Sequence, residues 1–235
     1  MNLSKLAFFE GSSEGFLKAL DENAHMKKCK KGKVLFLHGD PAEYFYIVKS
    51  GWVKLFRETL DGAQSISDIL PAGSIFGETA LFENDTHPYS AETIESSEIM
   101  SVPIKFLKDE LESNNAFTLK MLSYMARHRR RQDIEIEHRS IQNASQRIGC
   151  FLLRLVKKDH EGTIIIHLPY DKTLIASRLG MQPETFSRAL SKLKEKTGIR
   201  IKGATIEFDT LEQLTSYCCS CCSSEYPCKD LLAVE

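Results

Sequence analysis

A turn that contains glycine and proline, at residues 180–183, strongly constrains how the C-terminal third of this chain can fold. Proline has no backbone N–H, and at a first helical position that N–H would have no partner within the helix. The φ angle of proline is also already helical, so a helix is predicted to begin at or beside Pro183. Apolar residues then recur at spacings of three and four, which places them on one side of a helix. These residues are Phe186, Leu190 and Leu193. One face of a helix over residues 183–193 is therefore expected to pack in a core, and the other is expected to be free.

The segment before the turn, residues 171–179, has the apolar spacing of a short helix, with Asp171 as its expected N-cap. Two helices joined by a short turn with a glycine form a helix-turn-helix. The free face of the second helix carries Arg, Glu and Ser, which suit guanine, the cytosine amino group and either kind of base edge. The residues predicted to contact DNA are Thr173, Glu184, Thr185, Ser187, Arg188, Ser191 and Lys192. The alternative is an ordinary solvated face, since every amphipathic helix has a polar side.

Local charge favours the DNA-binding interpretation. Residues 172–202 contain eight Lys or Arg against two Asp or Glu, whereas the whole chain has a formal net charge of −1. A positive surface of this kind is what binding to phosphates requires.

Short β-rich runs alternate with turn residues at spacings near ten over the first 105 residues. Regularly spaced short strands of this kind indicate a small antiparallel sandwich or barrel. One or two short helices are expected before them, over residues 3–23. The predicted strands cover residues 34–37, 44–48, 52–56 and 66–70.

A long helical pattern follows Pro103 and continues to Arg139. Its apolar seam consists of Phe117, Met121, Leu122 and Met125. A long helix that buries little against its own domain is a candidate for pairing with a second copy, and a solvated linker helix is the alternative. Beyond it we expect a helix over residues 147–156, a strand over residues 164–169 and a hairpin over residues 199–208, which would make the helix-turn-helix winged.

Composition narrows the setting of the protein. The chain has 235 residues, of which 42% are hydrophobic, so it can bury a sizeable core. No apolar run approaches the ~18 residues that a membrane-spanning helix needs, and the first residues do not resemble a secretory signal. We therefore expect a cytoplasmic protein with no membrane partner. Its seven cysteines are then not a disulfide framework, because the cytosol keeps thiols reduced.

The order of these elements resembles that of the Crp/Fnr superfamily of bacterial transcription regulators, and so does the segment Pro71-Ala72-Gly73-Ser74-Ile75-Phe76-Gly77-Glu78. The resemblance covers roughly residues 31–217. It implies an α+β fold and a homodimer that is not an enzyme, binds double-stranded DNA in successive major grooves and contacts RNA polymerase. The implied parts are a cyclic-nucleotide-binding-like antiparallel β-roll sensor (1–105), a long dimerisation helix (106–141), a winged helix-turn-helix (142–217) and a cysteine-rich tail (218–235).

Cyclic-AMP-binding members of this superfamily follow the Gly-Glu pair of the roll with an Arg-Ser pair that holds the cyclic phosphate. Here the loop is one residue longer, and Tyr89 stands where the arginine is expected. A neutral phenol cannot replace the charged, two-pronged grip of a guanidinium, so we do not expect cyclic AMP to bind, and Glu78 is expected to be structural. A cyclic-nucleotide-binding regulator is the alternative. The expected effector pocket contains Gly77, Glu78, Tyr89 and Ser90.

The recognition helix resembles that of Fnr-like proteins. Residues 184–188 have the pattern Glu-x-x-Ser-Arg, which in those proteins reads half-sites resembling TTGAT, with Arg on guanine and Glu on the paired cytosine. The sequence of residues 182–188 is also similar to that of nitric-oxide-responsive, haem-dependent regulators. Haem is therefore a rival cofactor, with His128 as a conceivable ligand.

Five of the seven cysteines lie within residues 218–228. Short loops of this kind hold iron–sulfur clusters through Cys thiolates, and an oxygen- or nitric-oxide-sensing cluster of the 4Fe-4S type is the favoured interpretation. Zinc, metal-free thiols and a thiol oxidoreductase with a Cys-x-x-Cys pair are the alternatives. Cys29 and Cys150 are expected to be buried. The expected metal ligands are Cys219, Cys222 and Cys228, with Cys218 or Cys221 as a possible fourth. The spacing of the first three resembles that of the cluster ligands in Fnr. In Fnr, however, these cysteines precede the β-roll, whereas here they follow the winged domain.

Overall fold

The computed structural model describes residues 6–9, 11–60, 62–82, 84–156, 162–168 and 172–219. The chain divides into two compact units between residues 126 and 127, within the long helix α3 (Asn115–Ile141). No helix in the described ranges is long and apolar enough to cross a membrane.

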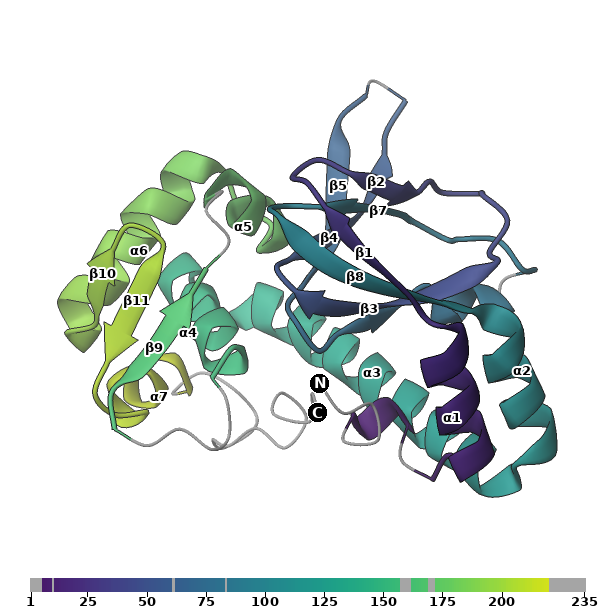
Figure 1. Ribbon diagram of the computed structural model, residues 1–235. Coiled ribbons are helices and arrows are strands. Elements are labelled where there is room, and N and C mark those ends of the chain that lie inside the picture. Colours follow the sequence, from purple (N-terminus) through teal and green to yellow (C-terminus); the bar gives the residue numbers. More distant parts are fainter. Residues whose placement is uncertain are drawn as a thin grey trace. The chain divides into compact units, whose positions relative to one another are not determined.

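Two four-stranded antiparallel sheets form the body of the first unit (Figure 1). Their orders are β1-β8-β3-β6 and β2-β7-β4-β5. Apolar side chains from both sheets, among them Val48, Leu55 and Ile99, form a shared core. The antiparallel β-roll expected from the sequence is therefore confirmed. The strands are β1 (His25–Cys29), β2 (Val34–Phe36), β3 (Tyr44–Ser50), β4 (Val53–Glu58), β5 (Gln64–Leu70), β6 (Ile75–Phe76), β7 (Ser90–Thr93) and β8 (Ser97–Pro103).

Helices cover the outer face of the β1-β8-β3-β6 sheet and enclose a second core. Phe45 on β3 and Val102 on β8 contribute to it from the sheet. Phe117 and Met121 of α3 also belong to it and are almost completely buried. Half of the apolar seam predicted on α3 is therefore core of its own unit. The other elements around this core are η2 (Ala7–Phe9), α1 (Glu14–Asn23), α2 (Ile104–Ser113) and the short η3 (Glu78–Phe82).

The prediction of one continuous helix from Pro103 to Arg139 is wrong, because the chain breaks at Asn114 between α2 and α3. Asn114 has an extended backbone, with φ −119° and ψ 94°. Its side-chain oxygen accepts a hydrogen bond from the N–H of Phe117, and its side-chain nitrogen donates to Glu110 and to the oxygen of Gly11. Asparagine at such a position satisfies backbone groups that a new helix leaves unpaired.

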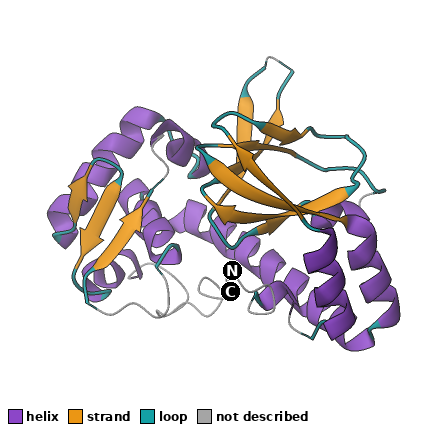
Figure 2. Cartoon of the chain, in the orientation of Figure 1, coloured by secondary structure: helices purple, strands orange, loops and turns teal. Residues whose placement is uncertain are grey.

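The second unit combines helices with a small antiparallel sheet of order β10-β11-β9 (Figure 2). Gly203 turns the predicted hairpin with φ 61°, and the winged helix-turn-helix is confirmed. The first helix begins at Ala144 rather than at Arg147, because Asn143 and Gln146 form a reciprocal capping box. The predicted N-cap Asp171 lies outside the described residues. The elements are α4 (Ala144–Arg154), β9 (Ile164–His167), α5 (Lys172–Arg178), α6 (Pro183–Thr197), β10 (Arg200–Lys202), β11 (Thr205–Phe208) and α7 (Glu212–Cys218).

Candidate nucleic-acid interface

Helix α6 is bounded as its sequence predicts. Gln182 is the N-cap and Pro183 the first helical residue. Gly198 ends the helix in the left-handed region with φ 72°, where its N–H bonds the oxygen of Lys194. The expected core stripe is confirmed, since Phe186, Leu190 and Leu193 are all buried. These contacts fix the rotation of α6 about its axis, and the polar side faces away from the core.

All the residues predicted to contact DNA are exposed. Four of them, all on α6, border an open hollow, and the Ser191 hydroxyl donates to the main-chain oxygen of Ser187 at 3.0 Å. Neither Glu184 nor Arg188 forms an ion pair with any residue in the described ranges. The hollow is lined by Ser187, Arg188, Ser191, Lys192, Glu195 and Lys196.

The turn before α6 is held by arginines from outside the helix-turn-helix. Arg147 of α4 donates to the main-chain oxygen of Leu179 at 3.1 Å, and Arg139 of α3 donates to that of Arg178 at 3.5 Å. These oxygens are among those that the end of α5 leaves without a helical partner. Sequence reasoning misses both arginines, because helical periodicity says nothing of contacts between distant elements.

Glu135 of α3 connects the same region to two further arginines. It forms ion pairs with Arg154 of α4 and with Arg178 of α5, the latter at 2.9 Å. Burial alone would raise the pKa of Glu135, but the two guanidinium groups lower it below its ordinary value. The carboxylate therefore stays ionised and links three helices.

In the β-roll, Tyr89 bonds the backbone of the predicted effector pocket. Its hydroxyl accepts a hydrogen bond from the N–H of Gly77 at 3.2 Å and lies 3.3 Å from the hydroxyl of Thr79. Burial raises the pKa of Tyr89, so the phenol stays neutral. Ser90 turns elsewhere, since its hydroxyl accepts from the N–H of His38 at 3.0 Å.

Two titratable groups with buried polar atoms lie beside this tyrosine in the roll. The Oε2 atom of Glu78 has no hydrogen-bond partner in the described part of the chain, and burial raises the pKa of Glu78 to about 7. The imidazole of His87 stacks on Phe36, with ring centroids 3.6 Å apart. Burial lowers the pKa of His87 to about 4, so the ring is neutral at physiological pH. No sequence motif marks His87.

The cysteines lie in contrasting environments. Cys29 and Cys150 are buried, as predicted. Cys218 is fully buried at the end of α7, where its sulfur lies so close to Gly149 of α4 that a Cβ at residue 149 would overlap it. Cys219 is partly exposed. The remaining predicted ligands, Cys221, Cys222 and Cys228, lie outside the described residues.

Within the described ranges, no group of three or more His, Cys, Asp or Glu side chains could hold a metal ion. His128, the residue considered for haem, is exposed on α3.

Comparison with protein families gives two matches in the order of the two units. Residues 26–114 match the cyclic nucleotide-binding domain, and residues 146–217 match the Crp-like helix-turn-helix domain. A solved structure of a candidate cyclic nucleotide binding protein from Ruegeria pomeroyi DSS-3 is 32% identical, with a TM-score of 0.69, and covers 89% of this chain and 92% of its own.

Curated relatives include regulators named for different signals. The fumarate and nitrate reduction regulatory protein of Escherichia coli is 26% identical over 92% of this chain and 89% of its own length. The cyclic AMP receptor protein of Thermus thermophilus is 29% identical over 75% of this chain and 80% of its own length. Relatives of this kind are transcription regulators and not enzymes. With its β-roll and its winged helix-turn-helix, the chain belongs to the Crp/Fnr superfamily of DNA-binding transcription regulators.

Proposed function

We propose that this regulator works as a homodimer that reads a palindrome of TTGAT-like half-sites and responds to oxygen or nitric oxide. The observation that carries the proposal is the polar face of α6, on which Glu184, Ser187 and Arg188 are exposed without an ion pair in the described ranges. Arg188 would bond guanine through its guanidinium fork, and Glu184 would accept from the amino group of the paired cytosine. Thr173, Thr185, Ser191 and Lys192 would contact the phosphates and edges around them.

The dimer interface is proposed to lie on α3. Phe117 and Met121 are used in the core of the first unit, but Leu119, Leu122 and Met125 remain exposed at spacings of three. A stripe of this kind on a long helix can pack against its twin. The domains would then be a sensor over residues 1–105, a dimerisation helix over 106–141, a DNA-binding domain over 142–217 and a sensing tail over 218–235.

The signal is proposed to act through a 4Fe-4S cluster held by Cys219, Cys222 and Cys228. Of the two candidates for a fourth ligand, Cys221 is favoured, because Cys218 is fully buried against Gly149. A bound cluster would supply a redox- and gas-reactive centre next to α7, which packs on α4. RNA polymerase is the proposed partner once the dimer is on DNA.

Two measurements test this proposal. Anaerobically purified protein should be coloured, contain iron, and shift a labelled TTGAT palindrome in preference to a scrambled one. Exposure to air or nitric oxide should change both the spectrum and the DNA affinity, and a Cys222→Ser variant should lose both responses. Equal affinity for the two DNA sequences would refute the half-site, and a colourless, iron-free protein would refute the cluster.

Tyr89 supports the exclusion of cyclic AMP from this function. Its hydroxyl already bonds the Gly77 N–H, and no guanidinium stands in its place. Labelled cyclic AMP should therefore show no saturable binding to the purified protein.

A further inference from the structure

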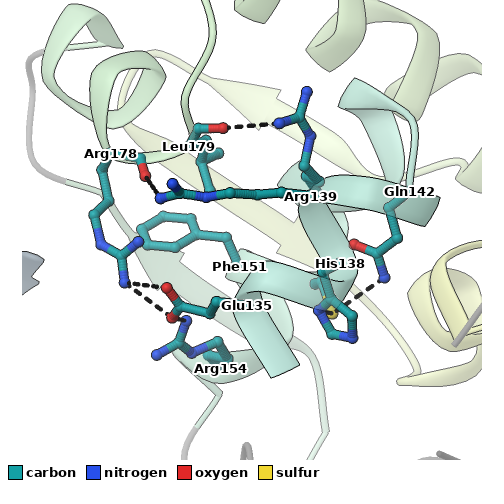
Figure 3. Close-up of a pocket in the computed structure, with 10 residues that line it drawn as sticks. Glu135, His138, Arg139, Gln142, Phe151, Arg154, Arg178 and Leu179 are labelled. Atoms are coloured by element: carbon teal, nitrogen blue, oxygen red, sulfur yellow. Dashed lines mark hydrogen bonds and ion pairs between the residues drawn. The ribbon is translucent and has the colours of Figure 1, made fainter. Parts of the chain in front are cut away.

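Four arginines line a cavity of about 40 Å³ between α3, α4 and α5 of the second unit (Figure 3). Arg139 comes from α3, Arg147 and Arg154 from α4, and Arg178 from the end of α5. Glu135 is the one acid among the lining residues in the described ranges. These described residues therefore carry three more positive charges than negative ones.

The charge is distributed unevenly within this cavity. The carboxylate of Glu135 already forms ion pairs with Arg154 and Arg178. Arg139 and Arg147 bond only main-chain oxygens, and neither has a carboxylate within ion-pairing distance in the part of the chain that the structure describes. The Nε atom of Arg147 is buried with no hydrogen-bond partner in that part. Two neighbouring cations thus have no counter-anion among the described residues.

The environment of Arg147 shows that this arrangement is unfavourable without a partner. Burial lowers the pKa of Arg147, and the nearby charge of Arg139 lowers it further. A buried hydrogen-bond donor without a partner is destabilising, and more so where the group is charged. An anion between the two guanidinium groups would remove both penalties.

We propose that this cavity binds a small divalent oxyanion of the phosphate or sulfate class, held by Arg139 and Arg147. Guanidinium groups bond oxyanions through paired, charge-assisted hydrogen bonds. A cavity that holds one water molecule has a volume of roughly 10–15 Å³. The cavity of about 40 Å³ therefore suits an ion of a few atoms and excludes a nucleotide. Two unpaired cations favour a divalent ion over a monovalent one. Arg139 is exposed, which gives the ion a path from solvent.

The position of the site gives it a consequence for the helix-turn-helix. The same two arginines hold the oxygens of Arg178 and Leu179, directly before the turn that leads to α6. A bound anion would tie α3 and α4 together beside that turn and stabilise the second unit. The inference does not depend on the half-site or on the cluster, because it concerns binding to the protein without DNA.

Thermal unfolding of the full chain in different sodium salts, at equal pH and ionic strength, tests the site. Phosphate and sulfate should raise Tm above its value in chloride by about 2–4 °C once the site is well filled, and nitrate should raise it less. Arg147→Gln and Arg139→Gln should each remove this difference. Arg129→Gln is the matched control on α3, since Arg129 is exposed and pairs with Asp133 outside the cavity, and it should retain the difference.

Calorimetric titration of phosphate and of sulfate provides the second readout. Arg139→Lys keeps the charge but loses the fork, and should bind at least about fivefold more weakly than the parent. If Arg147→Gln fails to fold, the Arg139 variants decide, because that side chain is exposed. Equal Tm values in all the salts, or a stabilisation that survives both glutamine variants, would overturn the proposal. A stabilisation lost in Lys192→Gln instead would place the ion on the recognition helix and overturn it too.

Discussion

Arg188 donates its Nε hydrogen to the main-chain oxygen of Glu184, 3.4 Å away, and not to the Glu184 carboxylate. Oppositely charged residues four apart on a helix often pair, yet no ion pair links these two. The charged ends of both side chains therefore remain available on the exposed face of α6. A donor fork and an acceptor at this spacing match the two halves of a G·C pair.

Arg188→Ala should remove the preference of the protein for the TTGAT palindrome over a scrambled sequence by about 1–3 kcal/mol, roughly a 5- to 150-fold loss of selectivity. Salt-sensitive binding to any DNA should remain, because the basic surround is intact. Competition gel shifts measure both quantities. Lys194→Ala is the control on the same helix, with an exposed side chain outside the hollow, and should leave selectivity unchanged. Unaltered selectivity in Arg188→Ala would remove the assignment of that side chain to a base.

Glu78→Gln should change how the stability of the protein depends on pH. Because burial raises the pKa of Glu78 from 4.5 to about 7, the folded state binds this proton more tightly than the unfolded state. The contribution of Glu78 to the free energy of unfolding is therefore greatest at low pH and is lost as pH rises from about 4.5 through 7. This loss amounts to roughly 3 kcal/mol. The difference in unfolding free energy between Glu78→Gln and the parent should grow by that amount in favour of the variant.

Urea denaturation at several pH values measures this difference, and the exposed Glu22→Gln on α1 should show none of it. His87 acts with the opposite sign, since its pKa is lowered to about 4 and its contribution is lost as pH falls below 6.5. Near pH 5–6 the stability of Glu78→Gln should consequently rise more steeply with pH than that of the parent. A constant difference between parent and variant across this range would contradict the prediction.

Glu135→Gln should destabilise the protein by about 2–3 kcal/mol, because it leaves Arg154 and Arg178 without their counter-charge in a partly buried site. The lowered pKa of Glu135 means that its stabilisation is present above the ordinary carboxyl pKa and is lost as pH falls through the folded value. Chemical denaturation should show this loss in the parent and not in the variant. Asp133→Asn, which breaks the exposed pair with Arg129, should cost less than about 1 kcal/mol. Similar costs for the two variants would argue against the bridging role.

Gly149→Ala tests the packing of α7 on α4. Alanine favours a helix over glycine by about 1 kcal/mol, but the added Cβ would overlap the sulfur of Cys218, and overpacking costs about 1–3 kcal/mol. The double variant with Cys218→Ala should recover at least about 1 kcal/mol relative to additive behaviour, as a double-mutant cycle by urea denaturation will measure. Strictly additive effects would mean that the two residues do not compete for the same space.

Local signals explain which parts of the fold can be predicted from the sequence. The helix-turn-helix is predictable because Pro183 fixes the start of α6 and apolar spacing fixes its buried face. Strands β2 to β5 are framed by turn residues. Strand β1 (His25–Cys29) gives no such signal, since only Cys29 is buried on this edge strand. Strand β7 (Ser90–Thr93) buries Ser90 and Thr93, which are polar. The break at Asn114 depends on contacts with Gly11 and Glu110, which helical periodicity does not reveal.

The candidate sites divide in the same way. Exposure of the DNA-facing residues follows from helical spacing alone. The hydrogen bond between Tyr89 and Gly77 requires two segments of the roll to meet, although the departure from the family pattern at Tyr89 is visible in the sequence. The arginine contacts with Arg178 and Leu179 span 39 and 32 residues, so no local pattern predicts them.

Those arginine contacts also mean that the helix-turn-helix cannot be transferred to another protein by itself. Residues 172–197 contain both helices and the turn, but the oxygens that close α5 are bonded by Arg139 and Arg147, which lie outside that stretch. A chimera that moves only α5 and α6 into another regulator would leave those oxygens without their donors. A chimera that transfers the DNA-sequence preference between relatives of this protein must therefore include the end of α3 and the start of α4 together with the recognition helix.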